Sequence, residues 1–197
     1  VFVAGAAVQW LRDDMRFITE SCDVEYYAGK VDDTGGVYMV PAFTGLGAPH
    51  WDMFARGTII GITRATKREH VIRAAEESIA YQTADLIHAI EKDTGIQLTE
   101  LNVDGGASRD NFLLQFQADI LDMSVIRPKI RETTALGAAY LAGLATGFWN
   151  STDELKKMRV SDKIFEPDMD KTKRTKLIKG WNKAVNRSLN WAEPDSE

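Results

Sequence analysis

The sequence predicts an α/β fold in which parallel strands are flanked by helices, and three observations lead to this class. Between residues 101 and 148, short β-type runs alternate with helical periodicities, an order that builds parallel strands joined by right-handed crossovers. Of the 197 residues, 44% are hydrophobic, which is ordinary for a globular protein with a buried core. No apolar run approaches the roughly 20 residues needed to span a bilayer, so we expect no membrane partner.

The first half of the chain combines helices with short extended runs. Apolar residues recur at three- and four-residue steps from Gly5 to Ile18 and, over six turns, from Glu69 to Asp93, and this spacing predicts two helices. The second is the longest expected helix, and Thr94-Gly95 marks its end. A shorter helix over 23–31 and extended runs over 1–3, 37–43 and 57–63 complete this half.

The second half has the regular alternation on which the fold class depends. Strands are predicted at Leu101–Val103 and Val125–Ile126, and helices over Ser108–Leu121 and Thr133–Phe148. We expect Ser108 to be the N-cap of the first of these helices. A final helix over 171–191 carries an apolar stripe and several basic residues, which we interpret as a solvated outer face.

Charge and cysteine content argue against several classes of function. The chain has 24 Lys and Arg against 29 Asp and Glu, a net charge of −5, whereas nucleic-acid binding needs clustered positive charge, so we expect no nucleic-acid partner. Cys22 is the only cysteine, which argues for a reducing, cytoplasmic setting. The three histidines lack the spacing of zinc ligands, and no Walker-type phosphate loop occurs.

Two short motifs carry candidate binding chemistry. In Val103-Asp104-Gly105-Gly106-Ala107-Ser108, two glycines stand between a strand and a helix. Glycines let a ligand approach the backbone, and the N–H groups of a helix start favour phosphate, although a tight turn without a ligand explains such a motif more often. The helix from Thr133 is rich in Ala and Gly; we interpret it as packed closely on the sheet, with an interdomain hinge as the alternative.

Four runs taken together resemble a known family. They are 4–13 (AGAAVQWLRD), 40–52 (VPAFTGLGAPHWD), 103–107 (VDGGA) and 132–143 (ETTALGAAYLAG). In order and spacing they resemble the FGGY carbohydrate kinases, and the run from Gly57 to Glu77 resembles the second signature of that family. The loop around Pro49 resembles the glycerol kinases more closely than the xylulose or ribulose kinases. The resemblance extends over the chain and corresponds to the C-terminal portion of those enzymes.

The resemblance implies an actin-like ATPase fold, with two ribonuclease H-like domains closing on ATP and glycerol. Residues 1–197 would form most of the C-terminal nucleotide-binding domain, with a mixed sheet flanked by helices and with the first strands of that domain missing on the N-terminal side. The whole enzyme would transfer the γ-phosphoryl group of ATP to glycerol and give glycerol 3-phosphate. The catalytic base, the glycerol contacts and the Mg²⁺ ligands would lie upstream, outside this chain, so we expect the chain alone to be inactive.

The resemblance also assigns nucleotide-binding residues within the chain. Gly5 and Gln9 match contacts on the phosphate side, and Gly106 matches the glycine under the nucleotide. Asp110 stands where the family usually has an asparagine near the adenosine, and Glu76 stands where an apolar residue is usual. An ionised aspartate accepts hydrogen bonds but cannot donate them. The resemblance therefore does not decide whether Asp110 contacts the adenine.

Two alternatives stay open on the sequence, and one expectation concerns assembly. The chain could belong to another FGGY sugar kinase, whose acceptor specificity would lie in the absent domain, or to a non-catalytic, actin-like nucleotide-binding module. With the first strands missing, we expect an unprotected sheet edge near Val1 that pairs with another chain. We therefore expect a homo-oligomer.

Overall fold

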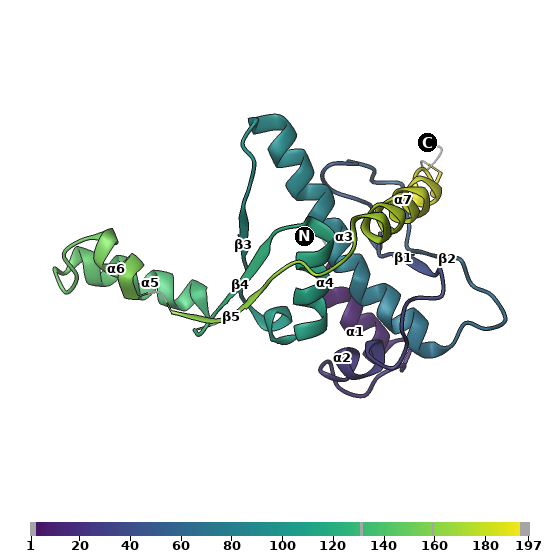
Figure 1. Cartoon of the computed structure of the whole chain (residues 1–197), viewed down its shortest axis with the longest axis horizontal. Helices are drawn as coiled ribbons and strands as arrows, with labels where there is room; N and C mark the ends of the chain where they lie inside the picture. The colour runs from purple at the N-terminus through teal and green to yellow at the C-terminus, as the bar shows by residue number, and fades with distance from the viewer. Residues whose placement is uncertain (1–2, 131, 159, 194–197) are drawn as a thin grey trace.

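The computed structural model describes residues 3–130, 132–158 and 160–193 and has the mixed α/β architecture that the sequence predicts (Figure 1). Its elements are α1 (Gly5–Asp13), α2 (Asp23–Ala28), β1 (Tyr38–Val40), β2 (Thr58–Ile60), α3 (Arg68–Thr94), β3 (Glu100–Asn102), the 3₁₀ helix η1 (Gly106–Arg109), α4 (Asn111–Leu121), β4 (Ser124–Pro128), α5 (Thr133–Ala145), α6 (Thr152–Met158), β5 (Ser161–Phe165) and α7 (Lys171–Ser188). The extended run expected over residues 1–3 falls mostly outside the described residues.

Helix α3 is the central element, and the body of the molecule is arranged around it (Figure 1). Its 27 residues include neither glycine nor proline, so no residue interrupts the hydrogen-bond ladder. The helix ends at Gly95, whose positive φ of 70° forms a left-handed cap and whose N–H donates to Glu91 at 2.8 Å. The longest helix predicted from the sequence is thereby confirmed, with its ends one residue beyond those expected.

The three-stranded sheet has the order β3-β4-β5 and is mixed. Strands β3 and β4 run parallel, with Leu101 opposite Val125, and β5 pairs antiparallel to β4, with Ile164 opposite Ile126. Helix α4 covers one face of the sheet through a small core that includes Ala118. The alternation of strands and helices is confirmed, whereas β5 and α6 are elements that the sequence reasoning missed.

Helix α7 closes the other side of α3 together with the short antiparallel hairpin β1–β2. Trp181 is buried, and its ring stacks on Tyr81 with centroids 5.2 Å apart. Its Nε1–H donates to Asp85 at 2.7 Å, so the polar edge of the indole is satisfied inside the core. Gly180 lets α7 approach closely, because a Cβ there would overlap the ring of Tyr38.

Two expectations about helices are corrected. Helix α1 ends at Asp13 and not at Ile18, because Arg16 adopts a left-handed φ of 55° and Phe17 N–H turns back to Leu11 at 2.8 Å. Helix α5 forms, but it does not pack closely on the sheet. None of its residues is buried, and Figure 1 shows α5 and α6 projecting together away from the body.

The Ala- and Gly-rich pattern of α5 led to the wrong expectation that this helix packs on the sheet. Small side chains permit close approach, but they do not identify the surface that is approached. Inside the arm, Gly143 makes the close approach, because a Cβ there would overlap the ring of Trp149. Among the described residues, none of the helices is both long and apolar enough to cross a membrane.

Candidate functional site

A cavity of about 550 Å³ opens where α1, α2, α3, η1 and the start of α4 meet. Its volume is in the range of small-molecule sites, which measure about 300–1,000 Å³. It is lined by Gly5, Val8, Gln9, Glu20, Ser21, Cys22, Val24, Glu25, Glu76, Ile79, Gly106, Ala107, Arg109, Asp110 and Leu113. All four residues that the sequence analysis assigned to the nucleotide therefore line one cavity, although they come from segments about 100 residues apart.

Glycine is not required by the protein's own packing at two of these positions. A Cβ built on Gly5 or on Gly106 would meet no atom within 4 Å. Gly105 differs, because its φ of 77° is a conformation that L-residues rarely adopt. In the Gly-Gly motif, Gly105 is therefore needed for the turn, whereas the missing side chain of Gly106 leaves open space beside the cavity.

The start of α4 corrects the expected cap. Ser108 is buried within η1, and its hydroxyl donates to the carbonyl of Gly105 at 2.7 Å. Asp110 is the actual N-cap of α4, because its Oδ1 accepts from Leu113 N–H at 2.8 Å. Asp110 therefore has a structural role, and it also lines the cavity.

Two side chains that the sequence reasoning missed hold the walls of the cavity together. Arg127 on β4 is buried and donates to the carbonyl of Ser108 at 3.1 Å and to Oδ1 of Asn111 at 3.2 Å. Glu25 on α2 accepts from the backbone N–H of Asn111 at 3.2 Å and from its side chain at 3.0 Å. Because these partners are 16 to 86 residues apart, local sequence patterns carry no signal for them.

Glu76 on α3 places a carboxyl group in the wall of the cavity. The residue is 2% exposed, and its Oε2 has no hydrogen-bond partner among the described residues. Burial raises the pKa of Glu76 well above its usual value, and the interaction with nearby Asp110 raises it further. The group is therefore a neutral acid over a wider pH range than an exposed glutamate.

The cavity suits a ligand with an anionic end. Helix α1 begins beside it at Gly5 without a side-chain cap, and the positive end of the helix dipole favours phosphate. Arg109 adds a positive charge at the rim. The described part of the chain contains no group of three or more His, Cys, Asp or Glu that could by itself hold a metal ion.

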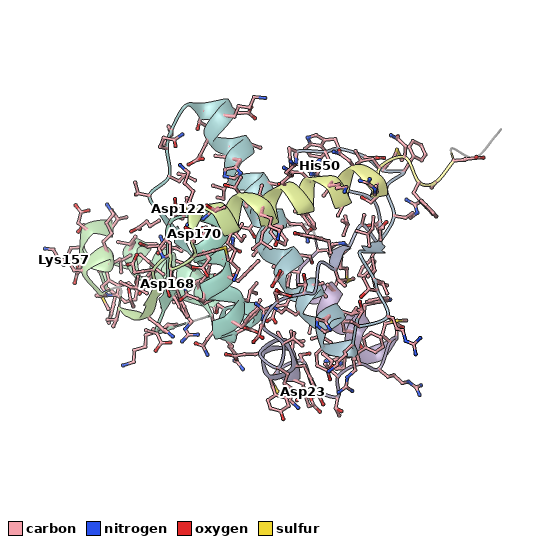
Figure 2. The ribbon with its side chains drawn as sticks, turned by 45° about the vertical axis from the view of Figure 1, so that its right-hand side comes forward. Asp23, His50, Asp122, Lys157, Asp168 and Asp170 are labelled. Carbon is pink, nitrogen blue, oxygen red and sulfur yellow. The ribbon has the colours of Figure 1, made fainter. Side chains whose placement is uncertain are left out.

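Other charged groups lie away from this cavity. Figure 2 shows Asp122, Asp168 and Asp170 near one another, beside the beginning of α7. Asp170 caps that helix by accepting from Thr172 N–H at 2.8 Å, and Asp122 is the C-cap of α4, at the opposite end from the cavity. Asp122 also pairs with Arg174 at 2.8 Å. Asp122 and Asp170 therefore have structural partners.

A second cavity, of about 560 Å³, lies between the sheet and the α5–α6 arm. Its wall is largely aliphatic, with Val103, Leu136, Met158 and Val160 among its residues. None of the four residues assigned from the sequence lines it. The first cavity is therefore the better candidate for a nucleotide site.

Comparison with known proteins identifies relatives over almost the whole chain. Residues 1–146 match the model for the FGGY family of carbohydrate kinases, C-terminal domain. The chain is 64% identical over 193 residues to glycerol kinase of Thermoanaerobacter pseudethanolicus (strain ATCC 33223 / 39E), covering 98% of this chain and 39% of that protein. It is 58% identical over 197 residues to glycerol kinase of Haemophilus influenzae (strain ATCC 51907 / DSM 11121 / KW20 / Rd), covering 100% of this chain and 39% of that protein. The chain thus spans about two fifths of the length of these curated relatives.

Solved structures show the same fold. The crystal structure of Plasmodium falciparum glycerol kinase with ADP superposes with a TM-score of 0.87 at 40% identity, over 94% of this chain and 37% of that one. Ligand-bound xylulose kinase from Lactobacillus acidophilus superposes with a TM-score of 0.79 at 24% identity, over 93% of this chain and 38% of that one. The architecture described above is therefore shared between kinases named for different acceptors.

Proposed function

The chain belongs to the FGGY family of carbohydrate kinases, and on this basis we propose that it is the nucleotide-binding half of an ATP-dependent glycerol kinase. In the whole enzyme, the γ-phosphoryl group of ATP would pass to glycerol and give glycerol 3-phosphate. We propose that residues 1–197 form the C-terminal domain, and that an N-terminal domain supplies the glycerol site, the base and the Mg²⁺ ligands. The names of the relatives, including one solved with ADP, support this proposal.

One observation about the chain itself carries the assignment of the site. Gly5 and Gly106 face the same cavity from different elements, and neither is required by packing. Close approach of a ligand to the backbone gives a reason for both. In the proposed complex the phosphates lie near Gly5 and Gln9, where the start of α1 contributes its dipole. The nucleoside lies near Gly106 and Asp110.

Calorimetric titration of the chain with ADP tests the proposed site. Gly106→Val puts a side chain into the open space, so we expect ADP affinity to fall at least tenfold while the free energy of unfolding changes by less than about 0.5 kcal/mol. Gly137→Val is the matched control: a Cβ at Gly137 also meets no atom within 4 Å, but the residue lies on α5. Equal ADP affinity in all three proteins would refute the placement of the nucleotide.

The reaction is tested by phosphorylation assays with labelled ATP. We expect the chain alone to give no glycerol 3-phosphate, because in our proposal the base and the glycerol contacts belong to the N-terminal domain. Joined to its own N-terminal domain, the chain should support transfer to glycerol and not to xylulose. Transfer to xylulose in place of glycerol would contradict the proposed acceptor.

We extend the proposal to location and assembly. A cytoplasmic location is supported by Cys22, an exposed and unpaired thiol that fits a reducing compartment. Homo-oligomeric assembly is supported by exposed apolar side chains on the arm, including Leu141 and Met158. Light scattering of the chain tests the assembly, and a strict monomer at high concentration would contradict it.

A further inference from the structure

Two acidic side chains, Glu76 and Asp110, line the wall of the proposed nucleotide cavity. Glu76 projects from α3, Asp110 stands at the start of α4, and both line the cavity. Glu76 is 2% exposed, and its Oε2 is buried without a donor in the described part of the chain. An ionised glutamate in this position would leave a charged acceptor unsatisfied, which is costly in a protein interior.

A proton on Glu76 removes this conflict. The neutral acid becomes a hydrogen-bond donor, and Asp110, whose interaction with Glu76 favours the neutral acid, is the natural acceptor. The proton of Glu76 is then shared between the two carboxyl groups. When a nucleoside binds, this proton can be donated to a ring nitrogen or an oxygen of the nucleoside instead, which provides the donor that an ionised aspartate lacks.

Building on the nucleotide site proposed above, we propose that Glu76 and Asp110 form a proton-sharing pair that contacts the nucleoside, so that this chain binds adenine nucleotides more tightly when the pair is protonated. A bound nucleoside excludes water from the pair and offers it an acceptor, and both effects favour the protonated form. Binding therefore takes up protons wherever the free pair is partly ionised, and nucleotide affinity falls as pH rises.

The charges around the pair are predominantly acidic and act in the same direction. Glu25 on α2 and Glu77 on α3 both favour the neutral form of Glu76. Glu20 and Arg109 line the same cavity, and both are exposed to solvent, which screens their charges. Arg109 is the cation at this cavity that could compete by stabilising an ionised pair.

Calorimetric titration with adenosine from about pH 5.5 to 8.5 tests the proposal. Adenosine carries no phosphate, and so avoids the titration of the ADP phosphates near pH 6. For the unmodified chain we expect affinity to fall roughly five- to tenfold with rising pH, on the scale of one hydrogen bond. Titrations in two buffers of different ionisation enthalpy should show uptake of a fraction of a proton on binding.

Three variants isolate the shared proton. Glu76→Gln keeps a permanent donor, so its affinity should be independent of pH and close to that of the unmodified chain at low pH. Glu76→Leu should be independent of pH and weak throughout. Asp93→Asn is the control, because Asp93 is exposed on the same helix, 17 residues away and roughly 25 Å along its axis, and it should retain the full pH dependence.

The outcomes separate this inference from the proposed function. Adenosine binding without proton uptake in the unmodified chain would overturn the shared proton and leave the nucleotide site standing, a result that needs no variant to fold. The same pH dependence in Glu76→Gln would also overturn it. Failure of adenosine and ADP to bind at any pH, in the unmodified chain and in Glu76→Gln, would refute the proposed function and this inference with it.

Discussion

Glu77 provides a direct test of whether burial or ion pairing controls a charge in this core. It follows Glu76 on α3 but lines a different cavity, and its Oε1 accepts from Arg73 Nε at 2.8 Å. The side chains of Arg73 and Glu77 are only 12% and 4% exposed. Burial nevertheless outweighs the attraction of Arg73 and raises the pKa of Glu77 from 4.5 to about 7. Lys173 on α7 lowers this pKa and Asp33 raises it.

The raised pKa fixes the sign and size of the effect on stability. The unfolded chain releases the Glu77 proton near pH 4.5, whereas the folded chain retains it to about pH 7. Raising the pH through this window therefore favours unfolding. At about 1.4 kcal/mol for each pKa unit, the loss of folding free energy attributable to Glu77 is roughly 3 kcal/mol. Glu77→Gln cannot ionise and should lack this component.

Urea unfolding of the unmodified chain and of Glu77→Gln, at about pH 5 and pH 8, measures the effect. The difference in unfolding free energy between the two proteins should move by roughly 2.5 kcal/mol in favour of Glu77→Gln between pH 5 and pH 8, because part of the effect already occurs below pH 5. Glu76 is present in both, so its own titration cancels to first order. Asp93→Asn should follow the unmodified chain at both pH values. A constant difference between unmodified chain and Glu77→Gln would show that Arg73 fully compensates the buried charge.

Four further substitutions test the packing, a helix cap and a buried hydrogen bond. Gly61→Ala should destabilise the fold by more than about 2 kcal/mol in urea unfolding, because φ is 91° and a Cβ would overlap the carbonyl oxygen of Gly36; a neutral result would disprove the contact. Asp110→Ala should lower the free energy of unfolding by about 1 kcal/mol in thermal unfolding, because it removes the α4 cap, whereas Asp110→Asn should lower it by only a few tenths of a kcal/mol. Equal losses in the two variants would refute the capping role. Trp181→Phe should cost roughly 1–3 kcal/mol, because it removes the donor to the part-buried Asp85; no loss of stability would exclude a contribution from this hydrogen bond.

The sequence predicts the elements best where a local pattern continues over several turns. The six-turn stripe of α3 and the helix of α4 are confirmed because each buries a broad face against neighbouring elements. Strand β5 was missed because its residues are exposed apart from Phe165, so it shows no inward-facing alternation. Its place in the sheet comes from pairing with β4, which lies more than 30 residues earlier.

The candidate site was predictable only in part, for a related reason. Gly5, Gln9, Gly106 and Asp110 follow from runs that resemble a family, and the structure brings them to one cavity, while their contacts with a nucleotide remain a prediction. Arg127 was missed because the sequence gives no indication that this charged strand residue is buried, or that it donates a hydrogen bond to a carbonyl of η1. Ser108 was mistaken for the cap because η1 inserts one 3₁₀ turn before α4 begins.

Adjacent glutamates on α3 couple the site to the stability of the fold. Glu76 faces the nucleotide cavity and Glu77 faces the cavity with Arg73, yet burial raises the pKa of each. Rising pH therefore weakens the fold through both residues, and it weakens nucleotide binding through Glu76 alone. A ligand that binds the protonated form of Glu76 more tightly stabilises the fold less once rising pH ionises this residue. It follows that adenosine, which has no phosphate to titrate, should raise the unfolding temperature of the unmodified chain more at low pH than at high pH, and that of Glu76→Gln equally at both.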